Sequence, residues 1–196
     1  FPGKKDGTKY EKLAYAVVNE LQKKADYYID LHSGDDYEKL TPYVYYAGKA
    51  DPEVTKISRQ MAEQVDVPYM VKSEASGGSY NYAASCGIPS VLLERGGMGD
   101  WDTEEVRSMK RDVRSILRFL GIYDGHASLR KYYPLNVTQV QYQSASYTGM
   151  WYPQKKAGDL FTEGEILGYV KDYEDNILEN SVAYGDGVIL YQAGSL

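Results

Sequence analysis

Two residues at the ends of expected strands have side chains that could carry hydrolytic chemistry. His32 closes the run Ile29-Asp30-Leu31-His32, and Glu94 follows the apolar run Ser90-Val91-Leu92-Leu93. A histidine that holds zinc, with a glutamate that deprotonates the attacking water, forms a hydrolase pair. The structural alternatives are a hydrogen-bonded strand-end histidine and a glutamate in a salt bridge to Arg95 or to a helix lysine.

Asp30 is the expected partner of His32. Side chains alternate along a strand, so Asp30 and His32 lie on one side and Leu31 on the other. A carboxylate in this position can orient an imidazole from behind while the imidazole binds a metal.

Alternating helices and strands must position these residues. We expect helices over residues 8–24, 51–65, 79–86 and 102–120, and strands over 27–31, 43–46, 69–71 and 90–93. Thr8 and Glu11 have capping-box spacing. The expected buried face of the first helix consists of Leu13, Ala14, Val17, Val18 and Leu21. This order predicts an α/β sandwich on a mostly parallel or mixed sheet, with His32 and Glu94 at the edge where its strands end.

The pattern changes near the end of the α/β region. Short β-prone runs at 139–147, 149–152, 166–170 and 188–191 alternate with turn sequences. We therefore predict an α/β domain over residues 1–133 and a small all-β barrel or sandwich over residues 134–196.

Composition argues against several classes of protein. The formal net charge is -6 and no Lys/Arg-rich stripe stands out, so no nucleic-acid partner is expected. No apolar run reaches the roughly 18 residues of a membrane span, so no membrane partner is expected. The single cysteine, Cys86, excludes an internal disulfide, and no leader is visible. A cytoplasmic protein is the expectation, and oligomerisation is left open.

The donor count is too small for a catalytic zinc. Such a site takes three protein ligands and keeps one open position. The chain has two histidines, and His126 lies in a loop where a solvated side chain is expected. No cysteine cluster, H-x-x-E or H-E-x-x-H is present.

Several stretches resemble the succinylglutamate desuccinylase/aspartoacylase family, relatives of the zinc carboxypeptidases. The resemblance is carried by Phe1-Pro2-Gly3 with Gly7-Thr8, by Ile29–Gly34, by Ile88–Gly97, and by the β-rich segments 157–168 and 185–188. It implies a carboxypeptidase-like α/β fold and zinc-dependent hydrolysis of the amide bond of a small N-acylated amino acid. His32 would be a zinc ligand, Glu94 the catalytic base, and Asp30 the residue behind His32.

The chain departs from the family pattern at its start. In the family, two of the three zinc ligands come from an H-x-x-E motif upstream of the segment that contains Phe1-Pro2-Gly3. The resemblance therefore implies an N-terminally truncated chain that is inactive alone. Two alternatives stay open: a carboxypeptidase-like peptide hydrolase, and a non-catalytic binding or scaffold protein on the same fold.

Overall fold

The structure is a computed structural model that describes residues 1–194, and it divides into two compact units. The first unit contains Phe1–His32, Tyr43–Glu94 and Val106–Gln139. The second contains Ser33–Pro42, Arg95–Glu105 and the described residues from Val140 on. The domain boundary between residues 133 and 134 stays a prediction.

A five-stranded mixed sheet forms the centre of the first unit. Its strands lie in the order β1-β5-β3-β4-β6. All neighbouring pairs are parallel except β3 with β5. The α/β architecture with a mostly parallel sheet, expected from the sequence, is confirmed. The strands are β1 (Tyr28–His32), β3 (Tyr43–Ala47), β4 (Tyr69–Ser73), β5 (Ser90–Glu94) and β6 (Leu135–Val137).

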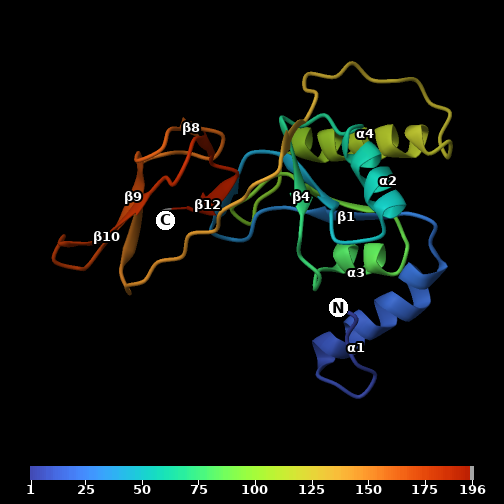
Figure 1. Cartoon of the computed structure of the whole chain (residues 1–196), viewed down its shortest axis with the longest axis horizontal. Helices are drawn as coiled ribbons and strands as arrows, with labels where there is room; N and C mark the ends of the chain where they lie inside the picture. The colour runs from blue at the N-terminus through green and yellow to red at the C-terminus, as the bar shows by residue number, and fades with distance from the viewer. Residues whose placement is uncertain (195–196) are drawn as a thin grey trace. The chain divides into compact units, whose positions relative to one another are not determined.

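Helices cover both faces of this sheet (Figure 1). α2 (Pro52–Ala62) and α4 (Thr103–Phe119) lie on one face, and α3 (Ser79–Ser85) lies on the other. Among the described residues, no helix is long and apolar enough to cross a membrane. Strand β5, which lies between β1 and β3, is covered by helices on both faces, as its unbroken apolar run predicts.

Alternation along β5 and β1 determines which face each side chain meets. Val91 and Leu93 pack with the α2 and α4 residues, whereas Leu92 packs with α3. On β1, Tyr28 packs on the α3 side and Ile29 on the opposite side. Side chains two positions apart on a strand lie on the same face. Asp30 and His32 therefore share the α3 face with Tyr28, and Glu94 shares it with Leu92.

The N-terminal helix differs from its prediction. α1 (Lys9–Ala16) has the expected Thr8 capping box, and the chain then continues as a π-helical segment, η1 (Val17–Leu21), and a 3-10 turn, η2 (Gln22–Lys24). The predicted buried face is wrong at Leu13 and Leu21, which are each 64% exposed. Only Val18 and Gln22 are buried in this segment. α1, which contains Leu13, has no buried residue, and the wider turn of η1 shifts the phase of the side chains that follow it, including Leu21.

The second unit is built from small antiparallel sheets. β9 (Ile166–Lys171) pairs with β10 (Ile177–Val182) and with β7 (Met150–Pro153). The two smaller pairs are β8 (Leu160–Phe161) with β11 (Gly187–Val188), and β2 (Glu38–Leu40) with β12 (Tyr191–Ala193). The strand predicted at 139–147 is wrong: this stretch is irregular and exposed, so its apolar side chains have no sheet face to cover.

Two buried serines fix the start of β5. The Ser58 hydroxyl of α2 donates to the Val54 carbonyl at 2.8 Å and accepts the Ser90 backbone N–H at 2.9 Å. The Ser90 hydroxyl in turn donates to the Tyr80 carbonyl of α3 at 2.6 Å. The strand that ends at Glu94 is thus tied to a helix on each face of the sheet.

We expect Ser58→Ala to destabilise the chain. The substitution leaves the buried Ser90 N–H without its acceptor, which costs about 1–3 kcal/mol. Urea unfolding measures this loss, and Ser76→Ala, in an exposed loop, is the matched control. Equal unfolding free energies for the two variants would contradict the anchoring role.

Candidate active site

His32 and Glu94 meet at the end of two paired strands. β1 and β5 run parallel, and their register sets His32 opposite Glu94. The imidazole Nδ1 lies 3.8 Å from Glu94 Oε1. The sequence predicts the two residues at one sheet edge, and the structure brings their side chains together there.

Asp30 completes a line of three polar side chains. Its Oδ1 lies 3.3 Å from His32 Nε2, so the imidazole has a carboxylate beside each nitrogen. The side chains of Asp30 and Glu94 are 18% and 13% exposed, whereas His32 is 49% exposed. The two carboxylates are therefore mostly shielded, and the imidazole is the solvent-facing member of the group.

The carboxylates change the protonation of His32. Its hydrogen bond to Asp30 raises the pKa of the imidazole. Partial burial opposes this shift, while the negative charges of Asp30 and then Glu94 add to it. The group can thus orient an imidazole and place a shielded carboxylate within reach of a water at the sheet edge.

A complete zinc site is not present in the described part of the chain. Among residues 1–194, no group of three or more His, Cys, Asp or Glu side chains could hold a metal ion. His32 offers one imidazole, and the carboxylates of Asp30 and Glu94 beside its two nitrogens do not form a metal-holding group with it. These residues alone therefore do not fit a catalytic zinc, which needs three protein ligands.

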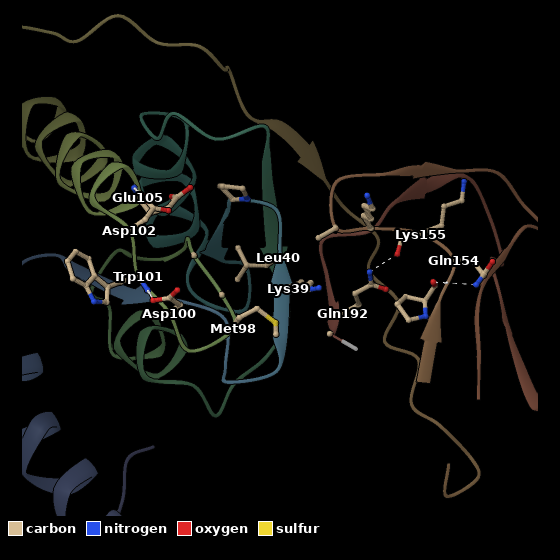
Figure 2. A pocket seen from close by; sticks show the side chains of 17 residues that line it. Lys39, Leu40, Met98, Asp100, Trp101, Asp102, Glu105, Gln154, Lys155 and Gln192 are labelled. Atoms are coloured by element: carbon tan, nitrogen blue, oxygen red, sulfur yellow. Dashed lines mark hydrogen bonds between the residues drawn. The ribbon is translucent and has the colours of Figure 1, made fainter. Parts of the chain in front are cut away.

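The second unit contains a hollow of about 790 Å³ that was missed in the sequence analysis. Figure 2 shows Asp100, Trp101 and Asp102 on one side and Gln154, Lys155 and Gln192 on the other. Gly96, Gly97 and Met98 also line it, all with positive φ. The glycine run after Glu94 was the available sequence signal, because it marks backbone that L side chains rarely adopt.

We expect Asp30→Asn to lower the pKa of His32 towards its ordinary value. The lost hydrogen bond is the largest contribution that raises this pKa. A pH titration of the imidazole resonances by NMR measures the shift. An unchanged His32 pKa in the variant would show that Asp30 does not interact with the ring in solution.

The same pair predicts a pH-dependent stability. Because folding raises the His32 pKa, the stabilisation is fully present below the unfolded value and is lost as the pH rises through the folded value. Asp30→Asn should therefore destabilise the chain more at about pH 5 than at about pH 9. Melting temperatures of both proteins at the two pH values test this, and a pH-independent difference would contradict it.

We expect the 196-residue chain to bind zinc weakly or not at all. One imidazole with neighbouring carboxylates lacks the several fixed donors that tight binding requires. Zinc content after gel filtration, measured by mass spectrometry, checks this. Stoichiometric zinc would contradict the donor count.

The comparisons with known proteins agree on one family. Residues 1–120 match the model of the succinylglutamate desuccinylase/aspartoacylase catalytic domain. The chain is 24% identical over 178 residues to an N-alpha-acetyl-L-2,4-diaminobutyric acid deacetylase of Halomonas elongata. That alignment covers 88% of this chain and 52% of the relative, so the chain spans about half the relative's length.

Solved structures show the same fold. The product-bound ectoine utilization protein EutE (DoeB) from Ruegeria pomeroyi has a TM-score of 0.85 at 23% identity, covering 98% of this chain and 61% of its own. A succinylglutamate desuccinylase/aspartoacylase from Rhodobacter sphaeroides has a TM-score of 0.84 at 26% identity, with 99% and 61% covered. Since the catalytic-domain model covers more than half of the chain, the protein belongs to the succinylglutamate desuccinylase/aspartoacylase family.

Proposed function

We propose that this chain contributes to the catalytic centre of a deacylase that hydrolyses the amide bond of a small N-acylated amino acid. The observation that carries the proposal is the pairing of His32 with Glu94 at 3.8 Å, at the end of adjacent parallel strands. The match of residues 1–120 to a family catalytic domain supports it.

Glu94 is the proposed general base. Its carboxylate is mostly shielded from solvent and lies next to the half-exposed His32 ring. From this position it would accept a proton from the water that attacks the amide carbonyl. The water oxygen would form a new C–O bond to the carbonyl carbon. Glu94 would then return the proton to the amide nitrogen, and the C–N bond would break to give the free amine and a carboxylate.

His32 is the proposed metal ligand, and Asp30 its positioning residue. A bound zinc ion would supply Lewis-acid polarisation of the carbonyl and a more acidic water. Asp30 would hold the imidazole at a fixed angle and increase its basicity through the contact at 3.3 Å. Because His32 is a single donor, a working centre needs ligands in addition to the residues described in the structure.

The substrate class is proposed from the relatives. The Halomonas elongata protein is named a deacetylase of an N-acetylated diamino acid. N-acetyl-2,4-diaminobutyrate is therefore the first compound to assay, alongside other N-acyl amino acids. Peptides with a free C-terminal carboxylate belong in the same panel, since their preferential cleavage would favour the carboxypeptidase-like alternative. Absence of turnover on the whole panel would favour a binding or scaffold protein.

We expect Glu94→Gln to lower kcat by about 10²–10⁴-fold in the protein as its gene encodes it. Glutamine has nearly the same volume but cannot accept the proton, so zinc content and melting temperature should change little. Glu74→Gln, at an exposed position after β4, is the matched control. Near-normal turnover by Glu94→Gln would overturn the proposed mechanism.

His32→Ala is expected to behave differently. Removing a metal ligand should abolish bound zinc and activity together. Parallel measurement of kcat and zinc content separates this outcome from simple misfolding, which the melting temperature reports. Full zinc retention by His32→Ala would contradict its role as a ligand.

A further inference from the structure

A second hollow lies in the first unit, near the C-terminal end of α4. It has a volume of about 220 Å³. Its polar walls come from Gln64 after α2, from Ser115 and Arg118 on α4, and from Ser128 and Arg130 on the following loop, and Phe119 and Ala127 complete the lining. None of these residues belongs to the candidate active site.

The two arginines in this hollow have no acidic partner. Among the residues that the structure describes, no carboxylate lies within ion-pair distance of either guanidinium. Arg118 donates to the His126 carbonyl at 3.0 Å and to the Ser115 hydroxyl at 3.3 Å. Arg130 donates to the carbonyls of Glu63 and Val65 at 2.8 and 2.9 Å. These neutral acceptors orient the arginines without neutralising them.

Two permanent positive charges in one small hollow repel each other. A guanidinium stays protonated at any physiological pH, so the repulsion cannot be relieved by losing a proton. Arg130 is also partly buried, and its Nε is a buried donor with no partner. The ring of Tyr133, 4.7 Å from its guanidinium carbon, covers one face and carries no formal charge. An anion in the hollow would compensate both charges.

The loop that carries Ser128 and Arg130 is unusually long. It runs from residue 120 to residue 134, between α4 and β6, without a helix or strand (Figure 1). Connections longer than about 12 residues in compact domains are uncommon and are usually either functional or linker segments, and this one is held by side-chain hydrogen bonds. Arg118 on α4 hydrogen-bonds to a carbonyl of this loop, and Arg130 on the loop hydrogen-bonds to carbonyls just after α2. These side-chain-to-backbone hydrogen bonds fix the walls of the hollow.

We propose that this hollow binds a phosphate group, as inorganic phosphate or as a small phosphate monoester. A phosphate carries close to two negative charges at neutral pH, which matches two guanidinium groups. The forked arginine donors and the hydroxyls of Ser115 and Ser128 suit its several acceptor oxygens better than the two of a carboxylate. A volume of about 220 Å³ leaves room for a single group of this size.

Calorimetric titration of the 196-residue chain with inorganic phosphate tests the proposal, at constant ionic strength against chloride. We expect saturable binding that Arg118→Gln weakens about tenfold or more, because a charge-assisted hydrogen bond is lost. Arg114→Gln, one turn earlier on α4, removes the same charge from a residue that does not line the hollow and should leave the affinity unchanged.

Further titrations distinguish the ligand classes. A small phosphate monoester should bind at least as tightly as phosphate if the hollow accepts the group from a larger molecule, and more weakly if free phosphate is the ligand. Acetate should bind at least tenfold more weakly than either. Ser128→Ala, which removes an exposed hydroxyl with little risk to folding, should weaken phosphate binding measurably. Absent saturation, equal effects of Arg118→Gln and Arg114→Gln, or equal affinity for acetate would overturn the proposal.

Discussion

The parallel pairing of β1 with β5 is the constraint on which the candidate active site depends. It places His32 directly opposite Glu94, although more than sixty positions of sequence separate them. A slip by one residue would turn one of the two side chains to the other face of the sheet. The register is protected by burial, since Val91 and Leu93 face one apolar layer and Leu92 faces the other. The positions of His32 and Glu94 at the strand ends therefore depend on the packing of the apolar residues that precede Glu94 on β5.

Much of this arrangement was predictable from local patterns. The unbroken apolar run before Glu94 predicts a strand buried on both faces, and Thr8 and Asp51 form the helix caps that their residue types favour. His32 and Glu94 could be placed at one sheet edge because strands of an α/β sheet end together. Sequence alone does not say that β5, rather than β3, is the neighbour of β1, because strand order is a tertiary property.

Other features lay beyond local patterns for identifiable reasons. Leu13 and Leu21 fit a helical stripe, but the helix that contains Leu13 buries no residue, and Leu21 lies in a π-helical segment that changes the phase of the helix. β10 was not predicted because Glu179, Asn180 and Ser181 have low strand preference, and pairing with β9 overrides it. The arginine-lined hollow joins residues from three separate segments, so no spacing rule could assemble it.

The donor set limits what these residues can do alone. Three neighbouring polar side chains, with His32 in the middle, provide a base and an oriented imidazole. They provide only one nitrogen ligand, whereas a catalytic zinc takes three protein ligands. The proposed division of roles follows from this difference: Glu94 moves the proton, Asp30 fixes the ring, and His32 is one donor of a larger set.

The central claim is that His32 and Glu94 act as one catalytic unit, and a double-mutant cycle tests it most directly. kcat would be measured for His32→Gln, Glu94→Gln and the double variant, in the protein as its gene encodes it, on an N-acetyl amino acid. Groups that work as a unit give strongly non-additive effects. We therefore expect the double variant to be no slower than the slower single variant. Two losses that multiply would contradict the account, because they would mean that the residues act independently.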